Sequence, residues 1–168
     1  HGKGVSLGFN HEAIQSLATT QNFYVGQCLY DSDKQHLLAY EIVDCLILMY
    51  QEGEDVNAIF QSVEADLMTI CALLKHPSFA EEQEWRLISP TFTSTADAPI
   101  AFREGKAMLV PYYLFDLELD GMINLDHVFV GPTPNAALSV NALMHYLTNK
   151  NARPEKGISD SEIPYRPR

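Results

Sequence analysis

The sequence contains few cysteines, and no two of them are spaced as CxxC. Cys28, Cys45 and Cys71 are odd in number and lie among apolar neighbours. This pattern predicts reduced core residues in a cytosolic protein rather than a disulfide framework. The histidines also lack HxxxH or HExxH spacing. Because neither thiolates nor imidazoles recur at metal-binding spacing, we predict no metal site.

Basic residues are scarce in this chain. It has 11 Lys and Arg against 22 Asp and Glu, which makes a formal net charge of -11. A protein that binds nucleic acid needs a basic footprint to neutralise phosphates. The composition therefore predicts no broad nucleic-acid surface, and it leaves a local basic pocket open.

Long hydrophobic runs are absent as well. The longest apolar run, "CLILMY" from Cys45 to Tyr50, is far shorter than the roughly 20 residues that a membrane span needs. The sequence also shows no signal-peptide pattern. We therefore expect a cytoplasmic protein that makes no contact with a membrane.

The chain has the length and composition of one folded domain. Its 168 residues are 46% hydrophobic, which is enough for a real core. The opening "HGKGVSLGFN" runs from a glycine turn straight into an alternating strand. Since strands seldom begin a domain without preceding chain, we expect residues 1–168 to be a single domain that lacks its N-terminal portion.

Hydrophobic spacing divides the chain into strand-rich ends and a helical middle. Alternation predicts strands over 5–9 and 23–30, and helical spacing predicts long helices over 33–52 and 56–74. The expected contact residues of this hairpin are Leu37, Leu38, Ile42, Cys45, Leu46 and Met49 on the first helix, and Ile59, Val63, Leu67, Ile70 and Leu74 on the second. Further strands and one late helix follow. The sequence thus predicts an α+β fold with a mixed or antiparallel sheet, an inserted long helical hairpin and a C-terminal helix.

The stretch "EEQEWRLI" places charge beside the only Trp of the chain. Alternation in an interior strand puts Glu84 and Arg86 on one face and a largely buried Trp85 on the other. A structural ion pair explains this pattern. The alternative is a catalytic carboxylate, held on a rigid strand and oriented by an arginine. Glu82, two residues upstream, is then a candidate partner acid on the same face.

Arginine is rare, and three of the five arginines stand beside aromatic residues. Arg86, Arg103 and Arg166 occur in "EWR", "AFR" and "PYR". The guanidinium fork binds phosphate or carboxylate in a geometry that Lys cannot match. Convergence of these side chains would form an anion pocket. The alternative is a set of separate pairs with acids such as Glu104 and Glu162.

The segment "VGPTPNAA" joins a strand to a helix. Pro134 suits the first helical turn, and Thr133 is the expected cap. Free backbone N–H groups at such a helix start can hold an anion. Plain capping is the favoured interpretation, because a single glycine does not make a phosphate-binding loop.

Several blocks together resemble a bacterial family, the domain of unknown function 2971. They are "GKGVSLGF", "EEQEWRL", "FREGKAMLVPYYLFDL", "VFVGPTPN" and "SEIPYR", in that order. In that family about a third of the domain normally precedes the first block. The layout is also distantly similar to the ADP-ribosyltransferase fold, and on that comparison Glu84 matches the late catalytic acid, with Glu82 as its partner. The early His or Arg of that fold has no counterpart in residues 1–168.

The family has no settled function, and the sequence leaves two kinds of function open, of which the first is the leading hypothesis. One is an intracellular protein that binds a phosphate-bearing nucleotide such as NAD, with ADP-ribosyl transfer or glycosidic cleavage. Glu84 would then stabilise the ribosyl cation, and Arg86, Arg103 or Arg166 would hold phosphates. The other is a non-enzymatic interaction or sensor module, for example in phage defence, whose acidic surface and helical hairpin meet a protein partner.

Overall fold

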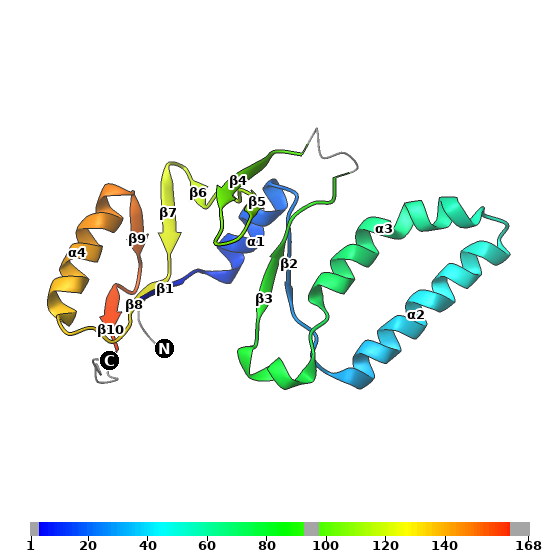
Figure 1. The fold of residues 1–168 in the computed structure, drawn as a ribbon, viewed down its shortest axis with the longest axis horizontal. Helices are drawn as coiled ribbons and strands as arrows, with labels where there is room; N and C mark the ends of the chain where they lie inside the picture. The colour runs from blue at the N-terminus through cyan, green and yellow to red at the C-terminus, as the bar shows by residue number, and fades with distance from the viewer. Residues whose placement is uncertain (1–3, 93–97, 162–168) are drawn as a thin grey trace. The chain divides into compact units, whose positions relative to one another are not determined.

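The structure of the protein is a computed structural model that describes residues 4–92 and 98–161 (Figure 1). Its contacts divide the chain into two compact units. The first unit combines both ends of the chain, up to Leu17 and from Phe115 onward. The second unit is the continuous segment Ala18–Leu114. The expectation of a single domain without its N-terminal portion stays a prediction.

The first unit contains two small three-stranded sheets, one long helix and the first part of a shorter helix, His11–Thr20, whose last three residues belong to the second unit. Strand β8 lies between β1, which is antiparallel to it, and β10, which is parallel. Strand β7 lies between β6 and β9 in the same mixed manner. The elements are β1 Val5–Gly8, α1 His11–Thr20, β6 Glu118–Leu119, β7 Met122–Leu125, β8 His127–Val130, α4 Ala136–Asn149, β9 Ala152–Pro154 and β10 Ile158–Asp160.

A hydrophobic core among the described residues is built from α4 and the neighbouring strands β7, β8 and β9. Leu125, Val128, Leu147 and Ala152 are buried together, and Val128 is fully inaccessible. Partly buried neighbours, among them Phe9, pack around them. Burial of these apolar side chains is the main force that holds the first unit together.

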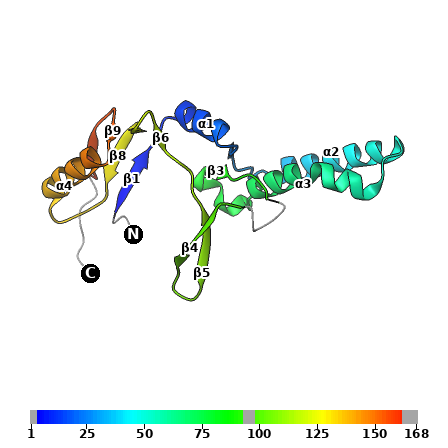
Figure 2. The same ribbon diagram turned by 90° about the horizontal axis from the view of Figure 1, so that it is seen from above.

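The second unit consists of helices and two two-stranded sheets. Strands β2 and β3 pair with each other, and so do β4 and β5, both antiparallel. A long helical hairpin is inserted between β2 and β3 (Figures 1 and 2). The elements are β2 Tyr24–Gln27, α2 Ser32–Gln51, α3 Val56–Leu73, the short 3-10 helix η1 Pro77–Glu82, β3 Trp85–Ile88, β4 Ile100–Glu104 and β5 Leu109–Tyr113.

The hairpin helices begin and end where the sequence supplies caps. Asp31 accepts hydrogen bonds from two backbone N–H groups at the start of α2, and Asp55 does the same for α3. These caps satisfy donors that have no partner within the helix. Gly53, in the turn between the helices, has a φ of 93°, a left-handed conformation that glycine adopts without strain.

The predicted α+β class and the inserted hairpin are confirmed, with several small sheets in place of one. All five predicted contact residues of the second helix are at least partly buried. On the first helix, Leu37 and Cys45 are exposed, and so is Cys71 on α3. The prediction that all three cysteines are core residues is therefore wrong for two of them. Two helices alone cannot enclose both faces of each other, which leaves these positions in solvent.

Helix α3 is also long and apolar enough, by length and composition alone, to cross a membrane. A single helix of this kind is weak evidence, because core helices of ordinary folded proteins meet the same criteria. It carries Glu64 and Asp66 near its middle. The expectation of no membrane contact stays a prediction.

Candidate functional site

A cluster of charged side chains lies where helix α3 ends and strand β3 begins. Glu84, directly before β3, forms ion pairs with Lys75 and Arg86. The Nε of Arg86 donates to Glu84 Oε1 at 3.1 Å, and its Nη2 donates to Oε2 at 3.3 Å. Lys75 also pairs with Glu82. The predicted residues Glu84, Arg86 and Glu82 thus meet around a lysine that the sequence analysis did not single out.

The backbone between the two acids explains why both reach Lys75. Glu82 is the last residue of η1, and Gln83 then adopts a left-handed conformation with a φ of 44°. This residue turns the chain between the 3-10 helix and the strand. The prediction that Glu82 shares a strand face with Glu84 is wrong, because Glu82 does not belong to a strand.

The cluster connects the hairpin to the β2–β3 sheet. Arg86 Nη1 donates to the carbonyl of Ala72, in the last turn of α3. Carbonyls in the last turn lack partners within the helix, and a cation there also interacts favourably with the helix dipole. The backbone N–H of Glu84 donates to the hydroxyl of Tyr30 at 2.9 Å. Arg86 and Glu84 therefore hold three segments that are distant in sequence.

Backbone hydrogen bonds reinforce the same junction. The N–H of Leu29 donates to the carbonyl of Leu73 at 2.8 Å, and the N–H of Lys75 donates to the carbonyl of Leu29 at 3.1 Å. The side-chain amide of Gln35, in the first turn of α2, donates to the carbonyls of Leu29 and Lys75. Both hairpin helices are thus fastened at this end.

The electrostatics of the cluster keep Glu84 ionised. The hydrogen bond from Arg86, and then that from Lys75, lower the pKa of Glu84 to about 2. Glu82 first, and then Glu84, raise the pKa of Lys75 above its ordinary value. The hydrogen bond with Glu84 raises the pKa of Arg86. A carboxylate with so low a pKa is a weak proton acceptor, which argues against a general-base role for Glu84.

The other predicted anion-binding arginines are Arg103 and Arg166. Arg103 lies on β4, in a different two-stranded sheet. Within residues 4–92 and 98–161, Arg103 forms no ion pair. Arg166 lies outside the residues that the structure describes. Convergence of Arg86 and Arg103 on one anion stays a prediction.

The exposure of side chains alternates along β3 as predicted, but the less exposed face is that of Arg86 and not, as predicted, that of Trp85. Trp85 is 53% exposed and Leu87 is also exposed, while Arg86 and Ile88 are partly buried. Arg86 is paired with Gly26, and a side chain at Gly26 would meet Leu73 of α3. Helix α3 therefore covers the face of Arg86. The predictions of an interior strand and a buried Trp85 are wrong, because within the described part of the chain β3 pairs only with β2, and Trp85 is more than half exposed.

The turn before α4 shows a second departure from expectation. The helix begins at Ala136, so Asn135 rather than Thr133 is the N-cap residue, and its side chain makes no capping bond. The Thr133 hydroxyl instead lies 3.4 Å from that of Ser139. A shallow hollow of about 360 Å³ lies beside this turn. Plain capping by Thr133, the favoured interpretation, does not occur.

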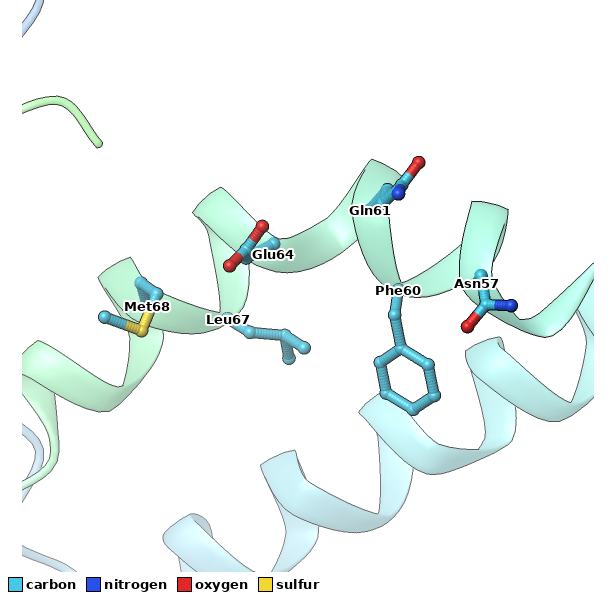
Figure 3. A pocket seen from close by; sticks show the side chains of 6 residues that line it. All are labelled: Asn57, Phe60, Gln61, Glu64, Leu67 and Met68. Atoms are coloured by element: carbon cyan, nitrogen blue, oxygen red, sulfur yellow. The ribbon is translucent and has the colours of Figure 1, made fainter. Parts of the chain in front are cut away.

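The hairpin carries a groove that the sequence analysis missed. It has a volume of about 400 Å³ and is lined from α3 alone, by Asn57, Phe60, Gln61, Glu64, Leu67 and Met68. Figure 3 shows Phe60 and Leu67 extending to the side of α3 on which α2 is drawn. Phe60 and Met68 are more than half exposed. The groove therefore has three apolar lining side chains, those of Phe60, Leu67 and Met68, and three polar ones that include the carboxylate of Glu64.

Helix α2 presents a second apolar surface, which we call the outer stripe. It consists of Tyr40, Val43, Ile47 and Tyr50, and these side chains are between 46% and 72% exposed. Their spacing of three, four and three residues places them on one face of the helix. The spacing is present in the sequence, but α2 has apolar residues on several sides, and only the expected contact residues were predicted to matter.

Comparisons with known proteins identify one family. The profile of the family described as "Protein of unknown function (DUF2971)" matches residues 1–87, just over half of the chain. No curated protein and no solved structure matches the chain. The match includes the blocks "GKGVSLGF" and "EEQEWRL" and ends before the later ones. The chain belongs to the DUF2971 family.

Proposed function

We propose that this chain is an interaction module whose helical hairpin, residues 32–73, contacts a protein partner. One observation carries the proposal: the hairpin exposes the outer stripe on α2 and, at the same time, the apolar side chains Phe60 and Met68 in the groove on α3. A helix that is apolar on nearly all sides is normally buried. Contiguous exposed apolar surface is typical of protein–protein contact sites.

The charged cluster supports this function because it holds the hairpin against the sheet. Glu84, Arg86 and Lys75 fasten the end of α3 to the β2–β3 sheet. A contact surface on a rigidly held element loses less conformational freedom when it binds. Under this proposal the charges of "EEQEWR" are structural, and the hairpin is the functional part.

The test is site-specific photo-cross-linking in cells that naturally make the protein. A benzoylphenylalanine replaces Tyr40 on the hairpin or, as a control, the exposed Phe102 on β4. We expect a covalent adduct of discrete mass with a second protein from position 40 and none from position 102. No adduct at position 40, or equal adducts at both positions, contradicts the proposal.

A second candidate function is NAD-dependent ADP-ribosyl transfer or glycosidic cleavage. The observation in its favour is that Glu84 remains a carboxylate at neutral pH, the form that can stabilise a ribosyl cation. Glu82 would be its partner acid, and Arg103 or Arg166 would hold phosphates, since the guanidinium of Arg86 is already bonded to Glu84 and Ala72. Both oxygens of Glu84 are also occupied, which places this candidate second.

Calorimetry with NAD, followed by an assay for released nicotinamide, tests the second candidate. It requires binding by the chain and a loss of turnover in Glu84→Gln, because Gln cannot supply negative charge to the transition state. Arg103→Ala should weaken binding without altering the fold. Absence of binding at millimolar NAD eliminates this candidate, and equal turnover in Glu84→Gln removes the catalytic residue from it.

A further inference from the structure

The outer stripe has the spacing of a helix-docking surface. From Tyr40 to Tyr50 it extends along α2 for about 15 Å, at 1.5 Å per residue. Apolar side chains three and four residues apart pack best against the same spacing on a second helix, where side chains of each fit between those of the other. The groove beside Phe60 and Met68 provides room for larger side chains on α3. A helical occupant therefore fits this hairpin better than an extended strand.

Charge decides which helix can bind. Between residues 32 and 73 the hairpin carries eight acidic side chains against one basic side chain, Lys34, a formal charge of -7. The acidic residues are Asp33, Glu41, Asp44, Glu52, Glu54, Asp55, Glu64 and Asp66. The hairpin is one quarter of the chain and holds most of its net charge of -11. Complementary potential favours a basic partner and accelerates its association.

We infer that the partner presents an amphipathic helix with an apolar stripe flanked by Lys and Arg. This inference rests on the proposed function. Its apolar side chains lie against the outer stripe and the groove. Its cations face acidic residues such as Asp44 and Glu64, which stand on the two helices beside these surfaces. Neither charge nor apolar area alone selects this occupant, whereas the two together do.

The same charge disfavours two other occupants of the apolar surface. A second copy of the chain would bring two hairpins of -7 into contact, and like charges at an interface oppose association. A membrane would require Glu64 and Asp66 of α3 to enter or approach the lipid, at a cost for each buried carboxylate. The anionic leaflet of a membrane also repels acidic segments.

The experiment uses the whole chain and a labelled peptide as the probe. The probe has about 18 residues, roughly 27 Å as a helix, with Leu on one face and Lys on the rest. A peptide with Glu in place of Lys is its matched control. Fluorescence anisotropy measures binding at about 0.1 M and about 0.5 M salt. We expect the Lys peptide to bind, with weaker binding at the higher salt, and the Glu peptide not to bind.

Variants that keep the charge separate docking from simple attraction. Ile47→Ser and Phe60→Ser remove apolar anchors while leaving the net charge unchanged, and each should weaken binding of the Lys peptide by about tenfold. Phe102→Ser, on β4 of the same unit and also exposed, is the control and should bind as the wild type does. Circular dichroism verifies that the hairpin variants keep their helices. Equal binding by all variants overturns the inference, because the peptide then adheres to acidic surface only.

Failure of this inference can be told apart from failure of the proposed function. If position 40 yields a protein adduct in cells and the Lys peptide does not bind, the hairpin is an interaction surface for a partner of different chemistry. A dimer in sedimentation equilibrium that Ile47→Ser dissociates makes a second copy the occupant. Co-sedimentation with neutral or anionic phospholipid vesicles makes a membrane the occupant. Each of these three outcomes overturns the basic helix.

Discussion

Lys75 and Glu84 form an ion pair that joins the end of helix α3 to the start of strand β3. The two residues are nine positions apart, and the 3-10 helix η1 lies between them. Lys75 pairs with Glu82 and Glu84, and Glu84 pairs with Lys75 and Arg86. The charge beside Trp85 therefore takes part in attaching the hairpin to the sheet.

The first prediction concerns pH. The pKa of Glu84 is lowered from an ordinary value of 4.5 to about 2, so its ion pairs stabilise the fold fully above pH 4.5. This stabilisation is lost as the pH falls from 4.5 toward 2, because the carboxylate becomes protonated. Glu84→Gln lacks it at every pH. Thermal unfolding between pH 2 and 7 should show a gap in Tm between the two proteins that is constant above pH 5 and closes toward pH 2.

Comparison with the variant is needed because other carboxylates titrate in the same range. Their effects are common to both proteins and cancel in the difference. A gap in Tm that persists unchanged down to pH 2 would contradict the assignment of the pairs to ionised Glu84. No gap at any pH would mean that Lys75 and Arg86 find equivalent partners in the variant.

The second prediction concerns the core of the first unit. Leu147 and Leu138 both lie on α4, but Leu147 is 6% exposed and Leu138 is 69% exposed. Leu147→Ala should lower the free energy of unfolding by about 2–5 kcal/mol, because it leaves a cavity beside Leu125 and Val128. Leu138→Ala should change it by less than about 0.5 kcal/mol. Urea unfolding measures both, and similar losses in the two variants would mean that α4 packs through another face.

The helix starts provide a third prediction. Asp55 accepts hydrogen bonds from the N–H groups of Asn57 and Ala58 at 2.9 and 3.2 Å. Asp55→Ala should cost about 0.5–2 kcal/mol in the free energy of unfolding, the usual value of an N-cap. Asn135 occupies the same position before α4 but makes no side-chain capping bond, so Asn135→Ala is the matched control and should cost little. Equal losses in the two variants would contradict the difference between the caps.

The sequence predicted the hairpin well because its signals are local. Helical spacing located α2 and α3 within two residues of their observed ends. The same reasoning reversed the faces of β3, since alternation says that Trp85 and Arg86 point in opposite directions and says nothing of which side α3 covers. That choice depends on contacts with Ala72 and Leu73, which are distant from β3 in sequence.

Only part of the candidate site could be predicted from the sequence, because only part of it is formed by residues that are close in sequence. Glu84, Arg86 and Glu82 were found because they are adjacent in the sequence and unusual beside a Trp. Lys75 was missed, because a lysine seven residues or more from these acids shows no pattern that marks it as their partner. The outer stripe was missed for a different reason. Apolar residues at helical spacing predict burial, and only the structure shows that Tyr40 and Ile47 are exposed.

The last prediction concerns the fork of Arg86. Its guanidinium bonds both oxygens of Glu84 and the carbonyl of Ala72. A lysine has a single ammonium on a flexible stem and cannot reproduce this planar arrangement. Arg86→Lys should therefore keep the charge and loosen the junction, with several-fold faster hydrogen exchange at the backbone amides of Leu29 and Lys75. Native-state exchange followed by mass spectrometry or NMR measures these amides.

Arg103→Lys is the control for that experiment, since Arg103 is exposed on β4 and forms no ion pair among residues 4–92 and 98–161. Exchange at Leu29 and Lys75 should not change in this variant. If Arg86→Lys exchanges like the wild type, the pair of Lys75 and Glu84 suffices to hold α3, and Arg86 is free for another role. Arg86 would then again be a candidate for the anion-binding role that the sequence suggested. Faster exchange in Arg86→Lys alone would instead show that the guanidinium of Arg86 helps to attach the hairpin to the sheet.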